Sequence, residues 1–78
     1  MLRVVTFLAF EGLANLKRRD LVRQIESWGC IFIRHGGRHD WYQNPLTGES
    51  QPIPRHREIN ERLARQILRK LRNRDDQP

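Results

Sequence analysis

Apolar residues recur at helical spacing in two stretches of the chain, and the first stretch covers Lys17–Trp28. Its apolar positions are Leu21, Val22, Ile25 and Trp28. Side chains with this spacing lie on one face of a helix, so we expect that face to be buried. Asn15 is the N-cap that the pattern favours, and Gly29 stands where a helix commonly ends in a left-handed residue.

The second helical stretch runs from Ile59 to Arg72, with Asn60 as its expected N-cap. Its apolar arc consists of Leu63, Ala64, Ile67, Leu68 and Leu71. An adjacent arc carries the arginines Arg62, Arg65, Arg69 and Arg72. Basic residues on a solvated helix face are common, so we interpret this arginine arc as a contribution to solubility rather than as a site. The alternative is that the arc meets an acidic surface of a partner protein.

Between the helical stretches the pattern changes to that of strands. The expected strands are Cys30–His35, Arg38–Gln43 and a short third strand over about Glu49–Ile53. Gly36-Gly37 turns the chain between the first two, Asn44–Gly48 is a loop, and Pro54 ends the third strand. The predicted fold class is α+β, in the order α-β-β-β-α. Packing both helices on one face of a three-stranded antiparallel sheet buries both apolar stripes, as in double-stranded-RNA-binding-domain-like folds.

The charge of the chain narrows the class of partner. Its 78 residues allow one small domain, with 15 Lys+Arg against 9 Asp+Glu, a net charge of +6 and a pI near 11.0. Most of the basic residues are arginine, which binds phosphate through two parallel hydrogen bonds. This balance favours RNA or DNA as the partner over a membrane surface.

The N-terminal stretch and the single cysteine bear on the cellular compartment of the protein. Cys30 is the only cysteine, so no internal disulfide can form, and we expect a cytoplasmic protein. No stretch has the roughly 18 apolar residues of a membrane span, and Met1–Phe10 lacks a signal-peptide cleavage site. Met1–Ala14 can be a short strand, an apolar tail that packs on a partner, or a product of start-site assignment.

The stretch Gly36–Tyr42 is the main candidate for chemistry. Two glycines precede Arg38 and His39, and glycine lets another backbone or a ligand approach closely. Imidazole exchanges protons near neutral pH. It can take the proton from a ribose 2′-hydroxyl, or protonate the leaving 5′-oxygen, without a metal. The plainer alternative is that His39 is only a polar residue on an exposed strand.

Residues around His39 divide between binding and structure. Trp41 and Tyr42 point to opposite faces of a strand, so at most one ring can meet RNA and the other fills the core. Arg34, Arg38, Arg55 and Arg57 flank the stretch and can neutralise phosphates. For His56 a loop role and a phosphate contact both stay open. The spacings of Cys30, His35, His39 and His56 match no standard zinc pattern, so we expect no metal and no cofactor.

Several short segments, in their order and spacing, resemble one family. They are Leu21-Val22 through Gly29, Gly37-Arg38-His39 with Tyr42 three residues on, Ile53-Pro54-Arg55-His56, and the helix Leu63–Leu71. Over about Arg18–Leu71 they are similar to the HicA toxins, small mRNA interferases of bacterial and archaeal toxin–antitoxin pairs. Members of that family usually carry Gly-Ser-His at the turn, and here Arg38 stands in the serine place.

This resemblance implies a toxin that cleaves mRNA without a metal, with His39 as the catalytic residue and a HicB-like antitoxin as inhibitor. We expect residues 1–15 to be an extension, 16–72 the domain and 73–78 a flexible tail. The expected RNA-binding residues are Gly37, Arg38, Arg34, Tyr42, Arg55, His56 and Arg57. We expect the free toxin to be a monomer with no membrane attachment. The alternative function is a basic RNA-binding module without catalysis.

Overall fold

The structure is a computed structural model that describes residues 15–73, so the expectations for Met1–Ala14 lie outside the described residues. The elements in chain order are β1 (Asn15–Lys17), α2 (Arg18–Ser27), β2 (Ile31–Gly36), β3 (His39–Gln43), β4 (Ser50–Pro54), β5 (Glu58–Asn60) and α3 (Glu61–Leu71). The predicted order of one helix, three strands and a second helix is confirmed. The structure adds two short strands, β1 and β5, that the apolar pattern does not predict.

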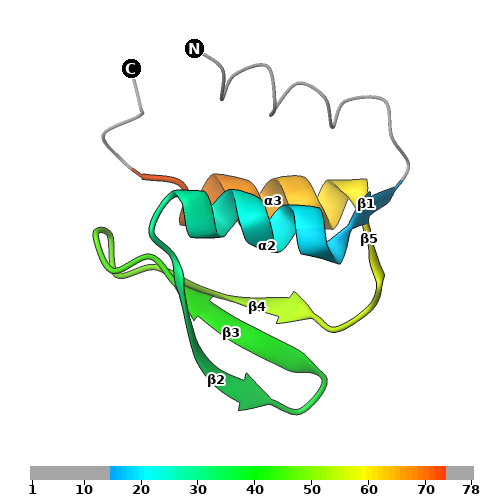
Figure 1. The fold of residues 1–78 in the computed structure, drawn as a ribbon, viewed down its shortest axis with the longest axis horizontal. Helices are drawn as coiled ribbons and strands as arrows, with labels where there is room; N and C mark the ends of the chain where they lie inside the picture. The colour runs from blue at the N-terminus through cyan, green and yellow to red at the C-terminus, as the bar shows by residue number, and fades with distance from the viewer. Residues whose placement is uncertain (1–14, 74–78) are drawn as a thin grey trace.

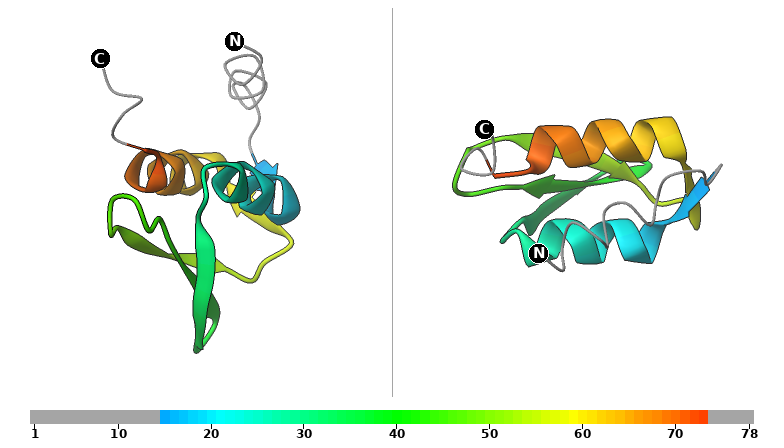
Figure 2. Two further views of the ribbon diagram at one scale, coloured as in Figure 1. Left: turned by 60° about the vertical axis from the view of Figure 1, so that its left-hand side comes forward. Right: turned by 90° about the horizontal axis from the view of Figure 1, so that it is seen from above.

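The three central strands form an antiparallel sheet in the order β2-β3-β4. Helices α2 and α3 lie side by side over one face of this sheet (Figures 1 and 2). We call the covered face the inner face and the opposite face the outer face. The expected α+β fold, with both helices on one side of a three-stranded sheet, is therefore confirmed.

Helix α2 begins differently from the prediction. Asn15 is not its N-cap, because it lies in β1 and pairs with Asn60 of β5. Lys17 occupies the cap position without a side-chain hydrogen bond, and the backbone N–H of Arg18 donates to the carbonyl of Arg57 at 2.9 Å. A contact from a distant segment thus satisfies one of the first N–H groups of the helix, which have no partner within the helix itself. At the other end Gly29 has φ 92°, as expected for a left-handed terminal residue.

Helix α3 begins as predicted at its cap, but one residue of the expected helix belongs to a strand. The Asn60 side chain accepts a hydrogen bond from the Arg62 backbone N–H at 2.8 Å. Ile59 lies in β5, where it pairs with Leu16 of β1 and is buried. The β1–β5 pair therefore brings the starts of both helices together at one end of the molecule (Figure 1).

The core lies between the helices and the inner face of the sheet. Its buried apolar residues are Leu16, Leu21, Ile25, Cys30, Tyr42, Ile53, Ile59, Ala64, Ile67, Leu68 and Leu71. Val22 and Trp28, expected inside, pack against this cluster while keeping part of their surface exposed. Leu63 was expected on the buried arc and is instead 39% exposed, so that expectation is wrong.

A buried asparagine joins the β3–β4 loop to the end of α3. Asn44 is fully buried, and its amide donates to the Leu71 carbonyl and to Asn73 Oδ1, both at 2.7 Å. Its Oδ1 accepts from the Leu46 N–H at 2.9 Å, which closes the loop locally. Every polar atom of this side chain is thus paired, as burial requires.

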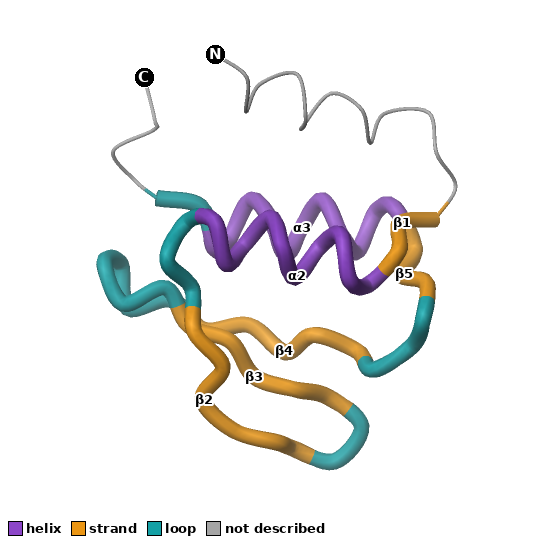
Figure 3. Tube along the Cα trace, viewed as in Figure 1, coloured by secondary structure: helices purple, strands orange, loops and turns teal. Residues whose placement is uncertain are grey.

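The β2–β3 hairpin reaches away from the helices, as the tube in Figure 3 shows. Gly36 pairs with His39, so the turn consists of Gly37 and Arg38 rather than of the two glycines. Gly37 has φ 57° and no other residue type in the described chain has positive φ, which fits a type II′ turn with glycine first. Such a turn needs glycine only at position 37, so Arg38 is compatible with it.

Candidate functional site

Strand β3 presents different residues to the two faces of the sheet. His39, Trp41 and Gln43 lie on the outer face, while Asp40 and Tyr42 are buried on the inner face. The predicted alternation, with Asp40 facing away from His39, is therefore what the structure has. Neither helix covers the outer face, so a large ligand can reach it (Figure 2).

His39 is exposed at the first position of β3, next to the hairpin turn. Its register partners are Gly36 on β2 and Pro54 on β4. Neither partner carries a polar side chain, and Gly36 has no side chain at all. Because the imidazole is exposed and neither helix covers this face, a phosphodiester can approach it from solvent.

Tyr42 does not lie where an RNA-binding ring would. It is 8% exposed within the core, and its ring meets that of Phe32 edge-on at 5.8 Å between centroids. The expectation that Tyr42 binds RNA is corrected accordingly, because a base cannot stack on a ring that the core covers. Of the two neighbouring rings, Trp41 is the one on the open face.

Arg34 and Trp41 form a stacked pair on the outer face. They are register partners on β2 and β3, and the guanidinium carbon of Arg34 lies 4.8 Å from the Trp41 ring centroid. A Cβ at Gly36 would come within 2.9 Å of Trp41 Nε1 and 3.0 Å of Arg34 Nη1. The missing side chain of Gly36 therefore makes room for this pair.

On the inner face, Asp40 accepts hydrogen bonds from three basic side chains. Oδ2 accepts from Arg18 Nη2 at 2.8 Å, and Oδ1 accepts from His35 Nδ1 at 2.7 Å and from Arg55 Nε at 3.0 Å. The hydrogen bond from His35, followed by that from Arg55 and the charges of both, lowers the pKa of Asp40, although its burial opposes the shift. Asp40 is thus an anion that fastens α2, β2 and the segment after β4 to β3.

Arg55 has a structural role at the hairpin turn. Besides binding Asp40, its guanidinium donates to the carbonyl of Gly37 and, at 3.5 Å, to that of His39. Its backbone N–H donates to the Arg38 carbonyl at 3.3 Å. We therefore interpret Arg55, expected to bind phosphate, chiefly as the residue that holds the turn preceding His39 in place.

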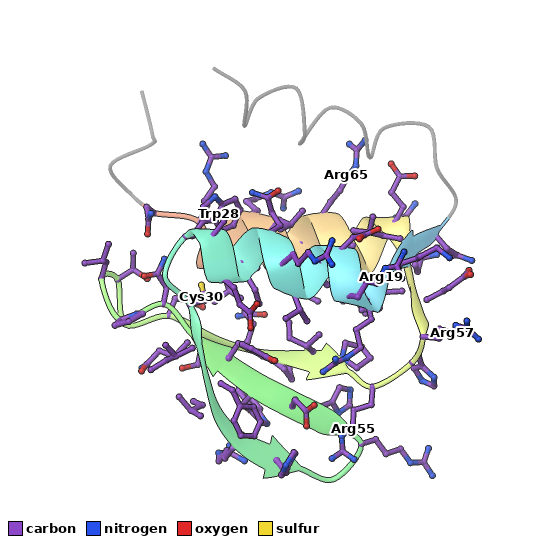
Figure 4. The ribbon with its side chains drawn as sticks, in the orientation of Figure 1. Arg19, Trp28, Cys30, Arg55, Arg57 and Arg65 are labelled. Carbon is purple, nitrogen blue, oxygen red and sulfur yellow. The ribbon has the colours of Figure 1, made fainter. Side chains whose placement is uncertain are left out.

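The remaining predicted residues lie at two places. Gly37 and Arg38 form the turn beside His39, with Arg38 exposed. His56 and Arg57 are exposed in the segment between β4 and β5, and Figure 4 shows Arg57 on the side of the molecule near β5 and Arg55 near the hairpin turn. The structure thus gathers Gly37, Arg38 and Arg34 around His39.

Cys30 and the other potential metal ligands are separated. Burial raises the pKa of the Cys30 thiol to about 11, so the thiolate required of a nucleophile or zinc ligand is scarce near neutral pH. Its Sγ lies 3.8 Å from the Leu71 carbonyl oxygen, in the core. Residues 15–73 contain no group of three or more His, Cys, Asp or Glu side chains placed to hold a metal ion.

Residues 15–73 also include no helix long and apolar enough to cross a membrane.

Sequence reasoning missed the interaction of Asp40 with His35, Arg55 and Arg18. The sequence pattern indicates only that Asp40 points away from His39. Its partners lie 5, 15 and 22 residues away along the chain. A lone acidic residue at an inward position of a strand is the one available signal, because a buried carboxylate requires basic partners. That signal predicts a cluster of basic residues around the carboxylate, but it does not indicate which residues form the cluster.

One comparison with known proteins identifies the family of the chain. A family model, described as the HicA toxin of bacterial toxin–antitoxin systems, matches residues 18–72. No curated protein and no solved structure matches the chain. The match covers most of the chain, including both helices, the three-stranded sheet and the hairpin with His39. The chain therefore belongs to the family of HicA toxins of bacterial toxin–antitoxin systems.

Proposed function

We propose that this toxin is an endoribonuclease that cleaves mRNA, with His39 as a general acid or base and without a metal ion. The observation that carries the proposal is the exposed imidazole at the start of β3, beside the side-chain-free Gly36. Imidazole is the side chain best suited to exchange protons at neutral pH, and this one lies on the open face of a basic protein.

The chemistry needs only groups that RNA, one imidazole and solvent water supply, with water exchanging whichever proton the imidazole does not. The 2′-hydroxyl loses its proton as its oxygen forms a bond to the adjacent phosphorus, and the bond from phosphorus to the 5′-oxygen breaks. The leaving 5′-oxygen takes up a proton. The products are a 2′,3′-cyclic phosphate and a 5′-hydroxyl. His39 can accept the first proton in its neutral form, or donate the second in its protonated form.

Basic residues at the hairpin support binding of the substrate. Arg38 projects from the turn beside His39, and Arg34 lies on the same outer face. Cations near a scissile phosphate neutralise its charge and attract the strand from solution. His56 and Arg57 can extend this contact along the RNA backbone beyond the hairpin.

The test is RNA cleavage by the purified protein in the presence of a chelator, comparing wild type with His39→Ala. We expect the wild type to cut single-stranded RNA and the variant to lose nearly all activity. Undiminished cleavage by the variant would reject His39 as the catalytic residue. If neither protein cleaves RNA but both bind it, the chain is a non-catalytic RNA-binding module.

We also propose that the partner of the toxin is an acidic, HicB-like antitoxin that covers His39. A net charge of +6 favours fast capture by an acidic protein, and such an encounter slows as salt screens the charges. Co-expression tests this. Growth arrest caused by the toxin should be relieved by the antitoxin and not by an unrelated acidic protein. Equal relief by both proteins would show that inhibition is not specific.

A further inference from the structure

The outer face of the hairpin carries a second feature next to His39 that the cleavage chemistry does not use. Trp41 is two residues after His39 on β3, so the two side chains point the same way, roughly 7 Å apart along the strand. Arg34 lies across from Trp41 on β2, with its guanidinium carbon 4.8 Å from the ring centroid. A stacked ring-and-cation pair thus lies one strand repeat from the candidate catalytic imidazole.

The geometry of this pair leaves Arg34 able to bind another molecule. No hydrogen bond or ion pair within residues 15–73 engages its guanidinium, whereas Arg18 and Arg55 are both bound to Asp40. The guanidinium carbon lies over the indole ring, and Arg34 is exposed to solvent. The indole also restricts the movement of the guanidinium, so less freedom is lost when a ligand binds.

Gly36 provides independent support for a built arrangement. Its backbone has none of the positive φ that would require glycine, yet a Cβ there would lie 2.9 Å from Trp41 Nε1 and 3.0 Å from Arg34 Nη1. Contacts below 3.0 Å force something to move. The absence of a side chain at position 36 therefore preserves the Arg34–Trp41 pair.

We propose that Arg34 and Trp41 form a subsite for one nucleobase, adjoining the phosphate on which His39 acts, and that the subsite favours guanine. Flat bases stack on aromatic rings and on guanidinium planes when a protein binds single-stranded RNA. The N–H donors at the edge of Arg34 match the two acceptors, O6 and N7, on one edge of guanine. This proposal rests on the proposed function for the position of the phosphate, and it makes the subsite a determinant of where the strand is cut.

Binding can be measured without cleavage. The probe is a 2′-O-methyl RNA heptamer with guanine at its centre, which cannot be cut through a 2′-hydroxyl, compared with the same heptamer carrying adenine or uracil. The observable is the indole N–H resonance of Trp41, with that of Trp28 as an internal control at the far end of α2. We expect the guanine heptamer to shift Trp41 most and to leave Trp28 unchanged.

Two substitutions test the subsite and one controls for charge. Arg34→Gln removes the cation, and Gly36→Ala displaces the pair while leaving both of its side chains present. Arg69→Gln removes one charge from the exposed side of α3. We expect the first two to weaken binding of the guanine heptamer by about 5- to 150-fold, the range that corresponds to loss of one stacked base. The third should weaken binding of all heptamers slightly and equally.

The outcomes separate this proposal from the proposed function. If RNA is never cleaved but the guanine heptamer shifts Trp41, the subsite stands as part of an RNA-binding module. If RNA is cleaved through His39 while Trp41 does not shift, or Arg34→Gln behaves like Arg69→Gln, the subsite is rejected and the nuclease stands. Thermal unfolding of each variant confirms that lost binding does not reflect lost folding.

Discussion

The helical side of the molecule and the β2–β3 hairpin differ in how far their side chains are exposed to solvent. Around α2 and α3, long apolar side chains are buried, and a fully buried asparagine has all its polar atoms paired. Along β2 nearly every residue is exposed, and Ile31, Phe32 and Ile33 retain 50%, 44% and 40% of their surface. The first region provides the free energy of folding, whereas the second presents side chains to solvent.

Beyond the contact of Tyr42 with the core, the two regions are joined through charge at the end of the hairpin. Asp40 binds Arg18 of α2, and it binds Arg55, which in turn holds the carbonyls of Gly37 and His39. An exposed hairpin without such ties would leave the direction of His39 poorly fixed. A small domain can therefore hold an exposed side chain such as His39 in place with little core beneath it, provided that a buried ion holds the strand.

The largest expected effect is that of His39→Ala on activity. Loss of a general acid or base should lower the RNA cleavage rate by about 10²- to 10⁴-fold. Because the side chain is exposed, the free energy of unfolding should stay within about 0.5 kcal/mol of wild type. Cleavage rates and urea unfolding, measured in parallel, check the predicted effects on activity and on stability. A marked loss of stability would break the proposed division between the two regions.

A core substitution should have the opposite profile. Leu68→Ala removes a fully buried side chain of α3 and should lower the free energy of unfolding by about 2–5 kcal/mol. Leu63→Ala, on the same helix but 39% exposed, is the matched control and should cost clearly less. Per folded molecule, both variants should cleave RNA at the wild-type rate. Equal costs for the two leucines would contradict the core described above.

Low pH should weaken the ionic contacts of Asp40 that connect the two regions. The pKa of Asp40 is lowered in the folded protein, and a free aspartate titrates near about 3.9. The ionised Asp40 therefore stabilises the fold above about pH 4, and this contribution is lost as the pH falls further towards the folded-state pKa. Asp40→Asn should flatten the decline of stability between about pH 5 and pH 3, as followed by thermal unfolding. Asp20→Asn, which removes one negative charge at a more exposed carboxylate, is the matched control.

The smallest expected effect concerns the two asparagines predicted as helix caps. Asn60→Ala should lower the free energy of unfolding by about 1 kcal/mol, because the side chain satisfies the Arg62 N–H. Asn15→Ala should change it by less than about 0.5 kcal/mol, since within residues 15–73 the Asn15 side chain makes a single hydrogen bond, of 3.4 Å, to Glu58 at the surface. Denaturant midpoints of the two variants provide the comparison, and a larger loss at Asn15 would restore it as a cap.

The sequence predicts the elements whose signals are local. Helical spacing of Leu21 and Ile25, and the capping asparagine before α3, are visible within a dozen residues, and the structure has both helices. Strands β1 and β5 have three residues each and lie about forty residues apart, so neither forms a recognisable pattern by itself. Their pairing depends on the tertiary fold.

The candidate site is predictable in part for a related reason. Alternation places Trp41 and Tyr42 on opposite faces, but it cannot say which face the helices cover. The structure buries Tyr42 and leaves Trp41 partly open. The role of Arg55 was equally hidden, since its acceptors on Gly37 and His39 lie 18 and 16 residues earlier in the chain.

The most direct measurement of the central claim uses an RNA with one preferred cleavage position and the same RNA with a single 2′-deoxy nucleotide there, both in chelator. Wild type should cut the first RNA to leave a 2′,3′-cyclic phosphate and should leave the second uncut at that position. His39→Ala should cut neither. Cleavage at the 2′-deoxy position, or wild-type rates in the variant, would contradict cleavage through the 2′-hydroxyl with His39 as the proton-transfer residue.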